Sequence, residues 1–181
     1  MNEQFTWLHI GLGSFHRAHQ AWYLHRLQVM GDKRWSIAAG NIRNDAEHVV
    51  QALSAQKGRY VLETVSPEGV SEYEEITSIQ KLIPWQADLQ PLIAEGADPK
   101  TKVIAFTVTE GGYYLNTSHK LEVNNPDLAA DLKGGCKTIY GVITRILEAR
   151  MANNAGPLTP VSYTNLTLPT NSRVKISVVA L

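Results

Sequence analysis

The chain has 181 residues, and its 17 lysine and arginine residues balance 17 aspartate and glutamate residues to give a formal net charge of zero. This balance argues against a basic face for nucleic acid. No apolar stretch has the length of a membrane span, and no basic segment precedes the first apolar run as in a signal peptide. The single cysteine, Cys136, excludes an internal disulfide and fits a reducing compartment. We therefore expect a cytoplasmic globular domain that binds neither nucleic acid nor a membrane.

The first third of the chain is predicted to alternate strands with helices. Residues 6–10 (TWLHI) and 35–40 (WSIAAG) are short apolar runs typical of buried strands. Between them, apolar side chains recur at helical spacing over residues 15–30. Asp45 is placed to cap a further helix over residues 46–55.

Two strands over residues 59–65 and 72–83, joined by a turn at Pro67 and Gly69, predict a small antiparallel insertion. The other expected elements are a helix over 86–94, a strand over 102–108, a helix over 137–151 with Leu147 on its apolar stripe, and a strand over 159–163. Strands that alternate with helices predict an α/β fold, namely a Rossmann-like, mainly parallel sheet with helices on both faces.

The stretch HIGLGSFHR follows the first strand and opens the first helix. The pair Gly11 and Gly13 at this place is typical of a turn that lets the backbone approach a pyrophosphate, with the helix N-terminus facing the anion. His16 replaces the third glycine of the usual pattern, and Arg17 beside it can donate charge-assisted hydrogen bonds to phosphate. The alternative is a plain strand-to-helix turn in which both glycines only supply positive φ angles.

Polar residues also follow two other predicted strands. Asn41 and Asp45 lie where a dinucleotide fold often holds the adenosine ribose, although Asp45 also fits a helix cap. Arg43 between them would favour a 2′-phosphate, so NADP stays open beside NAD. Thr109 and Glu110 follow the strand over 102–108, at the edge where parallel sheets bind ligands; the alternative there is a polar turn with an exposed glutamate.

A metal site is not expected in this chain. His16 and His19 are three residues apart on the predicted first helix, and His25 follows them. A metal site usually needs a third ligand placed nearby, and the local spacing supplies none.

Three stretches, HIGLGSFHRAHQAWYLHRL, AAGNIRNDAEHVVQAL and AFTVTEGGYYLN, together resemble the polyol-specific long-chain dehydrogenases, the mannitol dehydrogenase family. The resemblance covers about residues 1–159 and implies an NAD-binding Rossmann-like domain that is a monomer or a weak oligomer. It implies cofactor contacts from Gly11, Gly13, Phe15, His16, Arg17, Asn41, Asp45, Thr109 and Glu110.

The family's catalytic groups are a lysine base with asparagine and histidine partners in a second, mostly helical substrate domain, which is expected beyond residue 181. We therefore expect no catalytic residue in this chain and no activity from it alone. The resemblance implies a polyol substrate for the full-length enzyme, with oxidation of D-arabinitol to D-xylulose as the favoured reaction. The alternatives are related oxidoreductases that act on mannitol, fructuronate or tagaturonate, and a non-catalytic nucleotide-binding module.

Residues 160–181 depart from this resemblance. The run VSYTNLTLPTN resembles a translated sequencing adapter, so we expect a domain over residues 1–159 followed by a tail that is not native coding sequence. The alternative is a divergent natural tail. A foreign tail has no pocket shaped for it, so its β-prone run VKISVV is expected to be disordered or to pair with an exposed strand edge.

Overall fold

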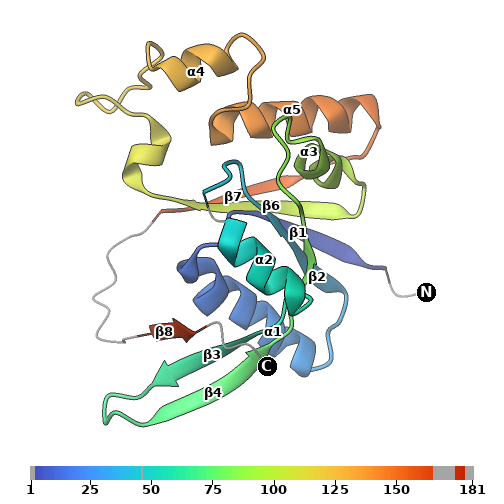
Figure 1. Cartoon of the computed structure of the whole chain (residues 1–181). Helices are drawn as coiled ribbons and strands as arrows, with labels where there is room; N and C mark the ends of the chain where they lie inside the picture. Colours follow the sequence, from blue (N-terminus) through green and yellow to red (C-terminus); the bar gives the residue numbers. More distant parts are fainter. Residues whose placement is uncertain (1–2, 46, 165–173, 178–181) are drawn as a thin grey trace.

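The computed structural model describes residues 3–45, 47–164 and 174–177 and places them in two sheets with helices around the larger one (Figure 1). The larger sheet contains five parallel strands in the order β5-β2-β1-β6-β7. They span Phe5–Ile10 (β1), Trp35–Gly40 (β2), Ile79–Leu82 (β5), Thr101–Val108 (β6) and Thr159–Thr164 (β7). The strand order reverses beside β1, since β2 and β5 extend the sheet on one side and β6 and β7 on the other. The predicted α/β fold with a mainly parallel sheet is confirmed.

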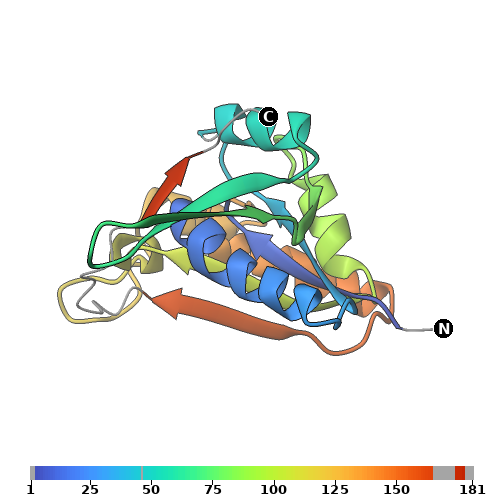
Figure 2. The same ribbon diagram turned by 90° about the horizontal axis from the view of Figure 1, so that it is seen from below.

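Helices cover both faces of this sheet (Figures 1 and 2). One face carries α1 (Ala21–Val29) and α2 (Glu47–Ala55), and the other carries α3 (Gln90–Ala97) and α5 (Ile139–Ala152). The short helix α4 (Pro126–Asp131) lies beside α5. No helix in the described ranges combines the length and the apolar character that crossing a bilayer requires.

Two hydrophobic cores form because side chains alternate between the faces of the central strands. Leu8 of β1 belongs to the core under α3 and α5, whereas Trp7 packs against the core under α1 and α2. In α5, Val142 and Ile146 are fully buried, as the helical spacing predicts. The expectation for Leu147 is wrong, because this side chain is 45% exposed and the apolar stripe of the helix is narrower than predicted.

The smaller sheet has the strand order β4-β3-β8 and contains the predicted antiparallel insertion. Its strands span Tyr60–Val65 (β3), Ser71–Ile76 (β4) and Val174–Ser177 (β8). The single strand expected over residues 72–83 is wrong, because the chain leaves the small sheet after β4 and enters the large sheet as β5. Ile76 and Ile79 are both buried, and two residues three apart share one face only when the strand is interrupted between them.

Other elements differ from the prediction at their boundaries or are new. The helix expected from residue 86 begins at Gln90, with a proline in its first turn, where the fixed φ angle of proline suits a helix start. Neither α4 nor the 3-10 turn η2 (Glu110–Tyr113) was expected, because segments of four to six residues are too short to show a periodic pattern.

Arg150, near the end of α5, ties together the segments at the amino-terminal edge of β6. The side chain is only 3% exposed. Its guanidinium donates hydrogen bonds of 2.7 to 3.2 Å to the backbone carbonyls of Gly96, Asp98, Thr101, Ala155, Gly156 and Pro157. One side chain therefore joins the end of α3, the start of β6 and the loop that leads to β7.

The expected domain boundary at residue 159 falls on the first residue of β7, which continues in parallel register with β6 through Thr164. Within the run VKISVV, the residues of β8 pair antiparallel with β3. Of the two expected possibilities, disorder and pairing with a strand edge, these residues show the pairing. Residues 165–173 and 178–181 lie outside the described residues. The expectation that residues 160–181 are not native sequence stays a prediction.

Candidate functional site

A cavity of about 390 Å³ opens at the carboxyl ends of β1, β2 and β6. It lies where the strand order of the sheet reverses, which is the place where open parallel sheets bind their ligands. Four of the residues predicted from the sequence line it, namely Gly11, Asn41, Asp45 and Thr109. The structure therefore brings together groups from three separate loops, as the sequence analysis expected.

The two glycines of the first loop have different structural reasons to be glycine. Gly11 has a φ angle of +124°, which side chains rarely adopt, and its N–H donates to the carbonyl of Gly40 over 2.7 Å. Gly13 is not in the left-handed region, and a Cβ atom placed on it would have no protein atom within 4 Å. The plain-turn alternative, in which both glycines supply positive φ angles, therefore does not account for Gly13. Its bare backbone instead offers an open surface beside the helix start.

The first helix begins at Ser14, and its residues His16–Gln20 form a π turn (η1) before α1. His16 is fully buried, its Nδ1 is 2.8 Å from Oε1 of Gln20, and its ring stacks on that of His9 with centroids 3.5 Å apart and planes at 7°. Burial chiefly lowers the pKa of His16 to about 4, although the Gln20 hydrogen bond opposes the shift. Burial also holds the pKa of His9 well below its usual range. Two neutral imidazoles thus lie underneath the glycine loop.

Arg17 supports the same loop from inside the fold. Its side chain is only 6% exposed and donates to the carbonyl of Leu12, the residue between the two glycines. The Tyr60 hydroxyl donates to the Arg17 carbonyl over 2.5 Å, and burial lowers the pKa of the guanidinium. The residues Gly13, Phe15, His16 and Arg17 do not line the cavity itself. Gly13 lies in the glycine loop, whose residue Gly11 lines the cavity, and Phe15 follows in the first helical turn. His16 and Arg17 lie beneath this loop.

On the other side of the cavity, a polar bridge joins the loop after β2 to the segment after β6. A guanidinium nitrogen of Arg43 lies 3.4 Å from the Tyr114 hydroxyl and 3.7 Å from Oδ2 of Asp127. The Tyr114 hydroxyl donates to the same Asp127 oxygen over 3.3 Å. Burial and the Asp127 carboxylate raise the pKa of Tyr114, so its hydroxyl keeps its proton. Below this bridge, Trp85 Nε1 donates to the Ile42 carbonyl over 2.9 Å and fixes the loop.

The start of α5 forms the third side of the cavity through Lys137, Thr138 and Ile139. The carboxylate of Asp131 accepts hydrogen bonds from the N–H groups of Lys137 (2.6 Å) and Thr138 (2.9 Å) and from the Thr138 hydroxyl (2.6 Å). Thr138 in turn caps the helix by accepting the N–H of Tyr140. The amides of Lys137 and Thr138, just before α5, and the amide of Tyr140 in its first turn are therefore already paired within the protein. Lys137 is the group at this helix start that adds positive charge to the cavity.

Thr109 follows β6 in an extended conformation and is exposed at the cavity, and Glu110 begins the η2 turn directly after it. Gly112 in this turn lies close to β6, since a Cβ atom on it would approach the Val108 Cβ to 3.0 Å. The sequence analysis missed Tyr114 and Lys137 as lining residues. A threonine before an apolar helical run is typical of a helix start and could have located Lys137 and Thr138, whereas no local pattern marks Tyr114.

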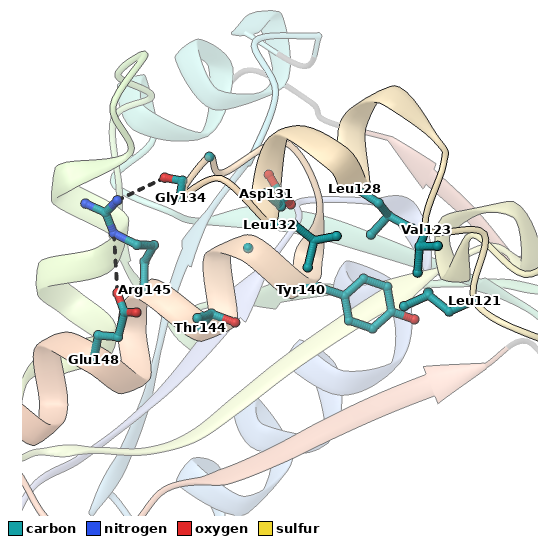
Figure 3. A pocket seen from close by; sticks show the side chains of 12 residues that line it. Leu121, Val123, Leu128, Asp131, Leu132, Gly134, Tyr140, Thr144, Arg145 and Glu148 are labelled. Atoms are coloured by element: carbon teal, nitrogen blue, oxygen red, sulfur yellow. Dashed lines mark hydrogen bonds and ion pairs between the residues drawn. The ribbon is translucent and has the colours of Figure 1, made fainter.

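A second cavity, of about 420 Å³, lies between α4 and α5 (Figure 3). The figure shows Leu121, Val123 and Leu128 facing the ring of Tyr140, while Arg145 reaches the carbonyl of Gly134 on the opposite side. None of the site residues predicted from the sequence lines it, and it lies away from the strand ends. We therefore take the cavity at the strand ends as the candidate site.

The doubly wound parallel sheet, the glycine loop after β1 and the cavity at the strand reversal define a Rossmann-type nucleotide-binding domain. Residues 6–180 match the model of the mannitol dehydrogenase Rossmann domain, so the chain belongs to the mannitol dehydrogenase family.

Comparison with individual proteins agrees with this family. The chain is 80% identical over 166 residues to a D-arabinitol 4-dehydrogenase of Klebsiella pneumoniae, covering 92% of this chain and 36% of the relative. It is 54% identical to a D-arabinitol 4-dehydrogenase of Ralstonia nicotianae over 88% of this chain and 35% of that protein. The Pseudomonas fluorescens mannitol 2-dehydrogenase, solved as a ternary complex with NAD and D-mannitol, superimposes with a TM-score of 0.82 at 30% identity, over 91% of this chain and 34% of that one. The chain spans about a third of the length of these relatives.

Proposed function

We propose that this domain binds NAD at the strand ends and serves as the cofactor-binding part of a polyol dehydrogenase that oxidises D-arabinitol to D-xylulose. The observation that carries the proposal is the cavity into which three loops bring Gly11, Asn41, Asp45 and Thr109. The 80% identity to a D-arabinitol 4-dehydrogenase supports the substrate.

The residues around the cavity fit the parts of a dinucleotide. The open backbone at Gly13 and the helix start after it suit the pyrophosphate, with Arg17 and His16 holding the loop from beneath. Asn41 and Asp45 suit the adenosine ribose, and Thr109, which Glu110 follows in the chain at the start of η2, suits the remaining half of the cofactor. When bound, NAD accepts the hydride that leaves the carbinol carbon of the polyol. The residues of this chain bind and orient the cofactor.

Two glycine variants separate nucleotide binding from folding. In Gly13→Ala the added methyl group meets no protein atom, so we expect an unchanged melting temperature but loss of NAD binding in calorimetry. Gly69→Ala in the β3–β4 turn, where φ is +85°, is expected to lower the melting temperature and to leave NAD binding intact. NMR shifts caused by NAD should fall on residues 11–17 and 107–111. Wild-type affinity in Gly13→Ala, or shifts confined to other regions, would contradict the proposal.

The substrate is tested in a chimera in which residues 1–159 replace the matching part of the Klebsiella relative. The chimera is expected to oxidise D-arabinitol with NAD, and the Gly13→Ala chimera to lose this activity. D-mannitol serves as the comparison substrate. A folded chimera that binds NAD without oxidising D-arabinitol would refute the assignment of this domain to that reaction.

A further inference from the structure

The bridge formed by Arg43, Tyr114 and Asp127 crosses the side of the cavity that follows β2. Arg43 and Tyr114 line the cavity, whereas Asp127 lies behind them in the first turn of α4. The Arg43 nitrogen is 3.7 Å from the Asp127 carboxylate and 3.4 Å from the Tyr114 hydroxyl. Among the described residues, Arg43 is the one arginine that lines the cavity, and it already contacts a carboxylate and a phenol of the protein.

This arrangement bears on which nucleotide the cavity accepts. In dinucleotide-binding domains, an acid after the second strand holds the free ribose hydroxyls of NAD, whereas an arginine nearby accommodates the 2′-phosphate of NADP. Both residue types occur here, since Asp45 and Arg43 line the same cavity. The preference therefore depends on whether the Arg43 charge is free to meet a phosphate, and the Asp127 carboxylate is the group that balances it.

The Asp127 carboxylate lies in the first turn of helix α4, where the helix dipole favours a negative charge. The cap of α4 is the neighbouring Asn125, whose side-chain oxygen accepts the N–H of Asp127 over 3.0 Å, and the Asp127 side chain instead meets Arg43 and Tyr114. Tyr114 ends the η2 turn in the left-handed conformation common at helix ends, with a φ angle of +51°. From this position its hydroxyl contacts both other members of the bridge.

We propose that Asp127 sets the nucleotide preference of this domain by holding Arg43, so that the cavity selects the unphosphorylated ribose of NAD over a 2′-phosphorylated ribose. Asp127 is a positioning residue that acts through Arg43. The inference rests on the proposed function, because it concerns the same cavity.

The test measures the dissociation constants of NAD and NADP for the full chain by calorimetry. In Asp127→Asn, Arg43 loses the carboxylate that balances its charge and is free to meet a phosphate, so the affinity ratio of NADP to NAD should rise about tenfold. Adding Arg43→Gln to this variant should return the ratio to the wild-type value. Tyr114→Phe, which keeps the Asp127 charge, should change the ratio by no more than about threefold. The matched control is Glu72→Gln, which removes one exposed carboxylate on β4 and should leave the ratio unchanged.

A merely structural role for Asp127 would weaken both nucleotides equally, so an unchanged ratio in Asp127→Asn overturns the inference. A raised ratio that persists in the double variant also overturns it, because the gain would then not pass through Arg43. If the wild-type chain binds NAD and these outcomes occur, the proposed function stands and only the inference fails. If the wild-type chain binds neither nucleotide, the proposed function fails and the inference with it.

Discussion

The stacked imidazoles of His9 and His16 should make the stability of this domain fall in mild acid. Both rings are fully buried and lie 3.5 Å apart, so neither accepts a proton easily in the folded protein. The pKa of His16 is lowered from 6.5 to about 4, and the pKa of His9 shifts in the same direction. In the unfolded chain both rings are in water and regain the ordinary pKa of histidine.

The sign of the effect follows from these pKa values. Below pH 6.5 the unfolded chain binds protons that the folded protein cannot accept, so the free energy of unfolding decreases as the pH falls. The decrease from His16 continues until the pH reaches about 4, where the folded protein also takes up the proton. For His16 alone the loss at that pH is about 3 kcal/mol, a large share of the stability of a typical domain.

Urea denaturation at about pH 7 and about pH 4.5 measures this loss, with a variant that cannot titrate as the comparison. His16→Phe keeps a flat ring to stack on His9, so its decrease in unfolding free energy over this range should be smaller than that of the wild type by about 2 kcal/mol. His48→Gln, at an exposed position of α2, serves as the control and should follow the wild type. A His16→Phe variant with the same pH dependence as the wild type would refute the reasoning from burial.

Three further outcomes are expected. Gly58→Ala should reduce the free energy of unfolding by more than about 2 kcal/mol in urea titrations, because φ is +79° and the new Cβ would lie 2.1 Å from the Ile79 carbonyl oxygen; a loss below 1 kcal/mol would contradict this. Arg17→Ala should reduce the free energy of unfolding by about 1.5–3 kcal/mol because the Leu12 carbonyl loses its charged donor, and should weaken NAD binding in calorimetry because the loop is less well held, whereas Arg26→Ala, on the exposed face of α1, should leave NAD binding unchanged. Removing residues 165–181 should change the melting temperature by less than about 3 °C if the tail is foreign, and a larger fall would favour a native tail.

The sequence predicted the large sheet well, because β1 and β6 are apolar runs of the length that buried strands require. It could not show that the chain changes sheets between β4 and β5, since both strands belong to one continuous β-prone stretch. The division of this stretch into two strands becomes visible only in the structure, where Ile76 and Ile79 are both buried but lie on strands of different sheets.

The candidate site was predictable where it depends on strand ends and not where it depends on side-chain direction. Asn41 and Thr109 follow predicted strands, so their place at the cavity follows from the parallel sheet. The burial of His16 and Arg17 was not predictable, because a π turn shifts the helix phase from the usual period. The contact of Arg43 with Asp127 joins segments far apart in the chain, and no local pattern encodes such a pair.

The hydrogen bonds of Arg150 imply an uneven distribution of motion in this domain. They close the edge of the sheet opposite the cavity, and every acceptor that the guanidinium meets there is a backbone carbonyl, which neither titrates nor exchanges partners with salt ions. Amide hydrogens at the start of β6 should therefore exchange with solvent only when the whole domain unfolds, whereas those around Gly13 should exchange through local opening. A sheet closed at one end in this way can keep its register while the loops at the other end adjust to a ligand.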